Sequence, residues 1–158
     1  MEFTSEIYLA SRESHLNDPI YRYKIKPLNI KCLGRQDNWT THFLNSEEIA
    51  KKINRPSEYF GKYIGHALSC PMKQDKDKNC LTFKGDHSGE TITKYFMEFV
   101  KIYVLCPNCD LPETKLFIQK EKNKPKGLSH SCDACGTNSA VKPKSFDKTF
   151  EYIEKNTK

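Results

Sequence analysis

The chain has 158 residues, 37% of them hydrophobic and 29% charged, and 26 basic against 20 acidic residues give a formal net charge of +6. This length suffices for one ordinary core and a small satellite module. No apolar run approaches the about eighteen residues of a membrane helix, and the N-terminus lacks the features of a signal peptide. We therefore expect a monomeric cytoplasmic protein without a membrane partner, whose charge permits nucleic-acid contact without requiring it.

The N-terminal part of the chain changes character near residue 20. Residues 1–19 mix polar and isolated apolar residues and end at Asn17-Asp18-Pro19, which stops any helix before it, so we expect a mobile tail. Residues 20–32 alternate in a strand-like manner, and 34–38 are rich in turn formers. With a return strand over 39–44, the pattern predicts a hairpin.

Two short helices are predicted next. Asn45, with Glu48 three residues later, has the spacing of a capping box and predicts a helix to about Ile53. Pro56 at a first helical position opens the second helix. The second helix has apolar residues at helical spacing, which predict one buried stripe: Tyr59, Phe60, Tyr63, Ile64, Ala67 and Leu68.

A second hairpin and a long helix complete the expected α/β core domain, residues 20–104. Strands at 69–72 and 80–83 flank a charged turn. Residues 89–104 place large apolar side chains at helical spacing, which predicts a helix that leads into the first C-x-x-C motif.

Four of the seven cysteines form two C-x-x-C pairs, Cys106 with Cys109 and Cys132 with Cys135, separated by 22 residues. This spacing is typical of four-cysteine zinc ribbons, because each pair lies on a tight turn and the thiolates converge on one tetrahedron. It predicts a ribbon over residues 105–142 with one structural Zn²⁺, while disulfides or chance are the other interpretations. A closed site of this kind stabilises the fold and leaves no open position to activate water.

The remaining cysteines, Cys32, Cys70 and Cys80, are interpreted as buried small hydrophobes, in line with a reducing compartment. The strand pattern of 115–119 predicts a ribbon strand, and 144–156 predicts an amphipathic helix in the C-terminal segment 143–158. No nucleotide-binding glycine loop and no H-E-x-x-H motif is present, so we expect no intrinsic active site.

Several short motifs keep their order along the chain. They are Tyr21-Arg22-Tyr23-Lys24, Asn54-Arg55-Pro56, Lys62-Tyr63 with Gly65, Val104-Leu105-Cys106-Pro107 with Cys109, Pro112-Glu113-Thr114, and Cys132 with Ala134-Cys135-Gly136. With these motifs, the chain from Tyr21 to about Tyr152 resembles the N-terminal domain of eukaryotic translation initiation factor five. The beta subunit of initiation factor two is related, but the Tyr-Arg-Tyr-Lys stretch belongs to factor five.

The resemblance implies an α+β fold, in which helices pack on a small mixed or antiparallel sheet, followed by the zinc ribbon and a closing C-terminal helix. It implies that the chain activates GTP hydrolysis by the gamma subunit of initiation factor two in the GTP-bound ternary complex. This activity takes part in start-codon recognition on the small ribosomal subunit. Arg22 matches an arginine supplied in trans, and Lys62 matches a supporting lysine. A guanidinium in trans neutralises charge on the transferring phosphoryl group.

The family's contacts with initiator tRNA are matched only in part. The matching residues are Lys31, Gly34, Arg35 and Lys78. Thr40 and Cys80 stand where the family has a lysine and, in some members, an arginine. An alternative is therefore a non-catalytic module that binds the P site or initiator tRNA, or competes with the host factor. A structural partner like the beta subunit would need a docking helix and lysine blocks that residues 1–19 do not supply convincingly.

Family members continue through an acidic linker into a helical-repeat domain that this sequence does not contain. The resemblance therefore allows either a truncated form or a natural stand-alone form, for instance from a virus.

Overall fold

A computed structural model describes residues 7–9, 24–75, 77, 80–109, 111–121, 124–141 and 152–153. The chain divides into two units. The sheet unit comprises Met1–Ile7 and Ile25–Glu98, and the ribbon unit comprises Tyr8–Lys24 and Phe99–Lys158. Most of the predicted tail and of the predicted helix 144–156 lies outside the described residues, although Tyr152 and Ile153 are helical.

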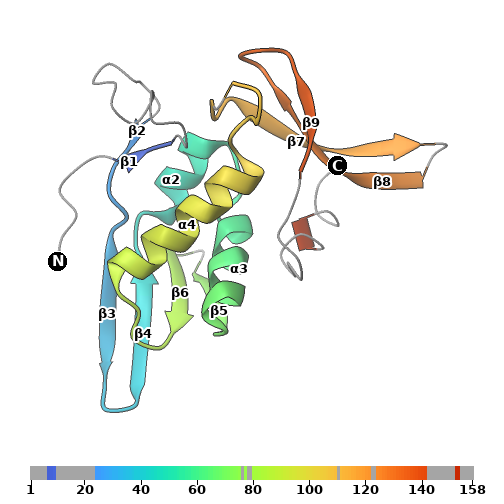
Figure 1. The fold of residues 1–158 in the computed structure, drawn as a ribbon. Helices are drawn as coiled ribbons and strands as arrows, with labels where there is room; N and C mark the ends of the chain where they lie inside the picture. The colour runs from blue at the N-terminus through green and yellow to red at the C-terminus, as the bar shows by residue number, and fades with distance from the viewer. Residues whose placement is uncertain are drawn as a thin grey trace. The chain divides into compact units, whose positions relative to one another are not determined.

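A four-stranded antiparallel sheet with the strand order β3-β4-β6-β5 forms the base of the sheet unit (Figure 1). The predicted first hairpin is present, with β3 (Ile30–Arg35) paired to β4 (Asn38–Phe43), but its predicted bounds are wrong. Residues 26–29 are not strand, and the turn is limited to residues 36–37, because Gly34, Arg35 and Asn38 pair within the strands. On the other side of β4 lies β6 (Cys80–Lys84), followed by β5 (Met72–Asp75). A separate two-stranded sheet pairs β1 (Ile7–Tyr8) with β2 (Lys24–Ile25).

The second hairpin is also confirmed, but the prediction of its first strand at 69–72 is wrong. Ser69 has a left-handed backbone with φ 54°, and its N–H caps the preceding helix through Gly65 and His66. Residues 69–71 thus connect the end of the helix to the strand, which starts only at Met72. Lys73, Gln74 and Asp75 therefore belong to the strand and not to a charged turn.

Helices α2 (Ser46–Ile53), α3 (Ser57–Leu68) and α4 (Gly89–Tyr103) correspond to the three predicted helices. Pro56, predicted as the first helical residue, is instead the N-cap of α3, one position before the helix begins at Ser57, and has the extended conformation of a cap. No helix in the described ranges has the length and apolar content needed to span a bilayer.

The predicted capping box at Asn45 is wrong. Asn45 has φ −106° and ψ 28°, which is not the extended conformation that aims a cap side chain at the helix N–H groups, and it makes no cap hydrogen bond. Its Oδ1 accepts from the backbone N–H of Asn29 at 2.9 Å, and its Nδ2 donates to the carbonyl of Pro27 at 3.1 Å. Asn45 therefore fastens the segment before β3, and Glu48 pairs with Lys26 at 3.5 Å.

The core of the sheet unit is a cluster of three phenylalanines that are fully buried. The Phe43 ring on β4 lies 5.7 Å from that of Phe60 on α3 and 6.5 Å from that of Phe96 on α4. Phe60 and Phe96 meet edge to face at 5.3 Å. Because both helices reach the same side chain of β4, α3 and α4 pack on the same face of the sheet.

The predicted stripe of α3 is correct at Tyr59, Phe60, Tyr63 and Ile64, which are buried. Ala67 is exposed and Leu68 is half-buried, so this part of the prediction is wrong. Gly61 and Gly65 make the contact with the sheet instead. A Cβ on Gly61 would lie 2.9 Å from Leu81 Cδ1, and one on Gly65 would lie 3.3 Å from Met72 Cβ. Glycine therefore permits α3 to approach β5 and β6 closely.

The ribbon unit contains a three-stranded antiparallel sheet, β7-β8-β9. β7 (Thr114–Glu121) includes the predicted strand 115–119 and pairs with β8 (Lys124–Cys132), with a register shift after Gln119. β9 (Asn138–Ala140), which was not predicted, adds to the other edge of β8. The side chain of Thr114 donates to the carbonyl of Val104, which joins the start of β7 to the segment after α4.

Candidate functional site

Two tight turns carry the four paired cysteines. After α4, the N–H of Cys106 donates to the carbonyl of Leu111 at 3.1 Å, which closes the first turn. The second turn is closed at 2.8 Å by the N–H of Gly136, whose φ of 74° favours glycine, to the carbonyl of Cys132. β-Strand pairing places Thr114 opposite Cys132, which brings the second turn back to the start of β7.

The four sulfur atoms converge. Cys106 and Cys135 are 3.7 Å apart at Sγ, Cys109 and Cys132 are 3.6 Å apart, and all four lie within 4.8 Å of one another. A disulfide requires about 2.05 Å, so neither pair is bonded. Four sulfurs bound at about 2.3 Å around a tetrahedral ion lie about 3.8 Å apart. The donor set therefore fits a metal ion and not a pair of disulfides.

The electrostatics of the thiols differ within the cluster, and burial raises the pKa of Cys132 although it shares a turn with Cys135. Cys135 is exposed, and a hydrogen bond with the Thr137 side chain, followed by one from the Asn108 amide, lowers the pKa of its thiol to about 6. Burial is the largest cause that raises the pKa of the Cys109 thiol to about 12. Since a metal requires thiolates, binding of an ion here would release the protons of thiols with a raised pKa, Cys109 among them.

The other three cysteines do not join this group. Cys80 is buried, as predicted, but Cys32 and Cys70 are only half-buried. The Cys32 thiol donates to the carbonyl of His87 at 3.3 Å and lies 3.6 Å from the Thr41 hydroxyl. The prediction that Cys32 is a buried small hydrophobe is therefore wrong, because its thiol is half-buried among polar groups.

The first hairpin displays three of the four residues that match the family's tRNA contacts. Lys31, Gly34 and Arg35 are all exposed on β3, and the hairpin tip extends beyond the helices (Figure 1). Gly34 has φ 150°, and a Cβ there would lie 2.2 Å from the carbonyl oxygen of Asn38. Only glycine fits at this position. The presence of glycine at residue 34 is therefore explained by the fold, without any ligand.

The other predicted site residues are placed less completely. Lys62 lies half-buried in the middle of α3. Arg22 and Lys78 lie outside the described residues, although Arg22 precedes β2 by two positions and Lys78 precedes β6 by two. The structure therefore groups the four cysteines and the three hairpin residues separately, one group in each unit.

Sequence reasoning missed one polar feature of the sheet. His42 lies between two threonines, with Nε2 at 3.0 Å from the Thr40 hydroxyl and Nδ1 at 3.3 Å from that of Thr82. Alternation along 39–44 could have assigned His42 to the face opposite Phe43, but not its partner on β6.

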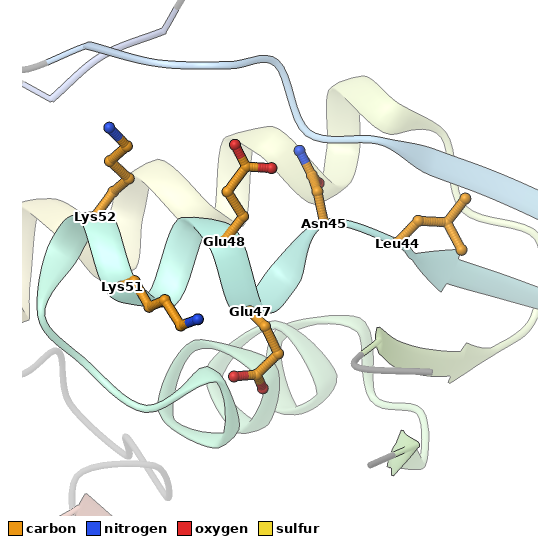
Figure 2. Close-up of a pocket in the computed structure, with 6 residues that line it drawn as sticks. All are labelled: Leu44, Asn45, Glu47, Glu48, Lys51 and Lys52. Carbon is orange, nitrogen blue, oxygen red and sulfur yellow. The ribbon is translucent and has the colours of Figure 1, made fainter. Parts of the chain in front are cut away.

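An open hollow of about 520 Å³ lies on the exposed side of α2. Figure 2 shows its six lining residues, which carry charges of both signs. They are Leu44, Asn45, Glu47, Glu48, Lys51 and Lys52. Glu47 accepts from the Ser57 hydroxyl at 2.5 Å and Glu48 pairs with Lys26, so both carboxylates already have partners within the fold. The hollow therefore has no excess of positive or negative charge that would attract a charged ligand.

The fold and the cysteine site define an α+β unit linked in sequence to a four-cysteine ribbon. A family model, described as a domain found in initiation factors 2B and 5, matches residues 13–138, and the chain belongs to this family.

Several similar proteins carry the name eukaryotic translation initiation factor 5, and the following three are among them. The Saccharomyces cerevisiae protein is 34% identical over 79% of this chain and 29% of its own length. The Caenorhabditis elegans protein is 35% identical over 84% of this chain and 29% of its own. "Probable eukaryotic translation initiation factor 5-1" of Arabidopsis thaliana is 34% identical over 90% and 31%. The chain spans about three-tenths of the length of these relatives.

Proposed function

We propose that this chain acts in translation initiation as a GTPase activator toward the initiation factor two ternary complex, in start-codon recognition on the small ribosomal subunit. The observation that carries the proposal is the family match over residues 13–138, which includes both the Tyr21-Arg22-Tyr23-Lys24 stretch and the cysteine quartet. The relatives that match over most of this chain are named translation initiation factor 5.

Arg22 supplies the chemistry in this proposal. A guanidinium is always charged and offers a planar fork of donors, so it can neutralise the charge that develops on a transferring phosphoryl group of another protein. Arg22 lies outside the described residues and precedes β2 by two positions. Lys62 on α3 is a supporting cation.

The four-cysteine cluster has a different role. We assign Zn²⁺ to it, because four thiolates with tetrahedral separations are the ligand set of structural zinc. When bound, the ion supplies a cross-link between the two turns and no reactive position. The cysteines hold the ion, and the hydrogen bonds of Cys106 and Gly136 hold the turns.

Single-turnover GTP hydrolysis tests the proposal. Ternary complexes bound to small ribosomal subunits are mixed with the zinc-loaded chain, and release of phosphate is followed. An arginine in trans raises hydrolysis by a factor on the order of 10³ to 10⁵. A rate unchanged at saturating chain would contradict the proposal.

Thr40 favours a second candidate, a non-catalytic binding module. Where the family has a lysine, the Thr40 hydroxyl donates to the carbonyl of Leu33 at 3.2 Å and contacts His42, so it is committed to the sheet. Co-sedimentation with small-subunit complexes separates the two candidates. Association without accelerated hydrolysis would support the binding module.

A further inference from the structure

The sheet of the first unit has one face that none of the described helices covers. Phe43 and Phe83 alternate with His42 and Thr82 along β4 and β6, and the phenylalanines face α3 and α4. The register therefore places the intervening residues on the opposite side. We call this side the outer sheet face. It carries Lys31, Leu33, Arg35, Thr40, His42, Lys73, Asp75, Thr82 and Lys84.

The charge of the outer sheet face is almost entirely positive. The strands β3, β4, β5 and β6 contain four lysines and arginines, all of them on this face and all exposed. The only carboxylate in these four strands is Asp75, which lies on the same face at the end of edge strand β5 and accepts from the backbone N–H of Asp77 at 3.1 Å. Such a face complements a polyanion.

His42 lies at the centre of this face, and its ring orientation follows from its two partners. Thr40 is two residues earlier on the same strand, and Thr82 is directly opposite on the next strand. One partner lies along the strand and the other across it, and imidazole nitrogens form hydrogen bonds in the plane of the ring. The ring is therefore held across the sheet surface, with one face turned away from the core.

The hydrogen bonds also assign the ring nitrogens. The Thr40 hydroxyl donates its proton to the carbonyl of Leu33, so it accepts from Nε2–H of His42. In the neutral ring, Nδ1 then accepts from the Thr82 hydroxyl. Both nitrogens are thus used within the sheet, and the outward ring face is what His42 offers to a ligand.

We propose that the outer sheet face binds single-stranded RNA, with one base stacked on the His42 ring and phosphates bound by Lys31, Lys73 and Lys84. An aromatic ring held flat on a sheet is a known platform for a nucleobase, and the surrounding cations can pair with the phosphates on either side of it. Leu33, 48% exposed, adds an apolar contact beside the ring. The proposal does not depend on activation of GTP hydrolysis.

Single-stranded RNA is favoured over an acidic protein segment because it uses both features of this face. An acidic peptide would pair with the cations but would not stack on a flat ring. Duplex RNA buries its bases in the stack and would offer only phosphates. The combination of an aromatic ring and cations therefore favours single-stranded RNA, whose bases are free to stack on the ring.

Fluorescence anisotropy tests this with the full zinc-loaded chain and a fluorescein-labelled RNA of about twelve nucleotides. His42→Ala should weaken binding about tenfold, since stacking contributes that much per base. His42→Phe keeps a ring and should stay within about threefold of the parent. Lys84→Gln should weaken binding and lower the slope of log K against log salt by about 0.7.

Lys52→Gln is the matched control, because it removes one exposed charge from α2 in the helical layer. It should leave the RNA affinity unchanged, and circular dichroism checks that every variant folds. Equal binding by the parent and His42→Ala would overturn the proposal, and so would equal loss in His42→Ala and His42→Phe. Competition by poly-glutamate at the same charge concentration as RNA would also overturn it.

Discussion

The sheet unit and the ribbon strands β7–β9 keep their shape by different means. In the sheet unit, Phe43, Phe60 and Phe96 are completely buried around one point. In the ribbon strands β7–β9, Leu128 is the only apolar side chain other than cysteine that is fully buried among those described, and Leu116, Phe117 and Ile118 are half-buried. Apolar burial stabilises the sheet unit, whereas the strands β7–β9 bury too little apolar surface of their own and need the ion; other buried apolar residues of the ribbon unit, such as Phe99 and Tyr103, lie on α4. Removal of one support should therefore affect either the sheet unit or the ribbon strands, and not both.

Removal of the metal should have the largest effect. We expect a chelator to expose the ribbon amides of β7 and β8 to hydrogen exchange, while the amides of β4 and β6 stay protected, because the binding energy of structural zinc is folding energy. Hydrogen exchange read by mass spectrometry measures both. Cys132→Ser should reproduce the result and Cys70→Ser, at a half-buried site outside the cluster, should not. Equal loss of protection in both units would contradict the comparison.

Truncation of the aromatic core comes next. Phe60→Ala should destabilise the sheet unit by about 3–5 kcal/mol, because it leaves a cavity between Phe43 and Phe96. Denaturant unfolding followed by circular dichroism gives this value. Phe117→Ala removes the same atoms from a half-buried site on β7 and should cost about 1 kcal/mol or less. Similar costs at the two sites would show that the ribbon has a core of its own.

A smaller effect is expected at the interface between α3 and the sheet. Gly61→Ala should cost about 1–3 kcal/mol, because the new methyl would meet Leu81 at 2.9 Å and Met72 at 3.1 Å. Gly89→Ala is the control, since its methyl would lie 3.8 Å from Ile30 and helix propensity favours alanine. Thermal unfolding compares the two. A Gly61→Ala protein as stable as the parent would mean that α3 can move away from the sheet at no cost.

The parts that could be predicted are those with a local signal. The cysteine quartet has diagnostic spacing, and the first hairpin and the three helices follow from periodicity and turn residues. Gly61, Gly65 and the bonds of Asn45 could not be predicted, because each depends on which segment packs opposite. His42 is the same case, since its partner Thr82 lies 40 residues away on another strand. Only the register of β4 and β6 brings them together.

We propose that Arg22, and neither the ribbon nor the aromatic core, provides the chemistry. Single-turnover GTP hydrolysis on small-subunit complexes tests it with Arg22→Ala and Arg22→Lys, each loaded with zinc. We predict a rate lower by a factor on the order of 10³ or more for Arg22→Ala, with association retained. Arg22→Lys should also be strongly impaired, because an ammonium lacks the planar fork of donors. An Arg22→Ala protein that hydrolyses GTP as fast as the parent would contradict the account.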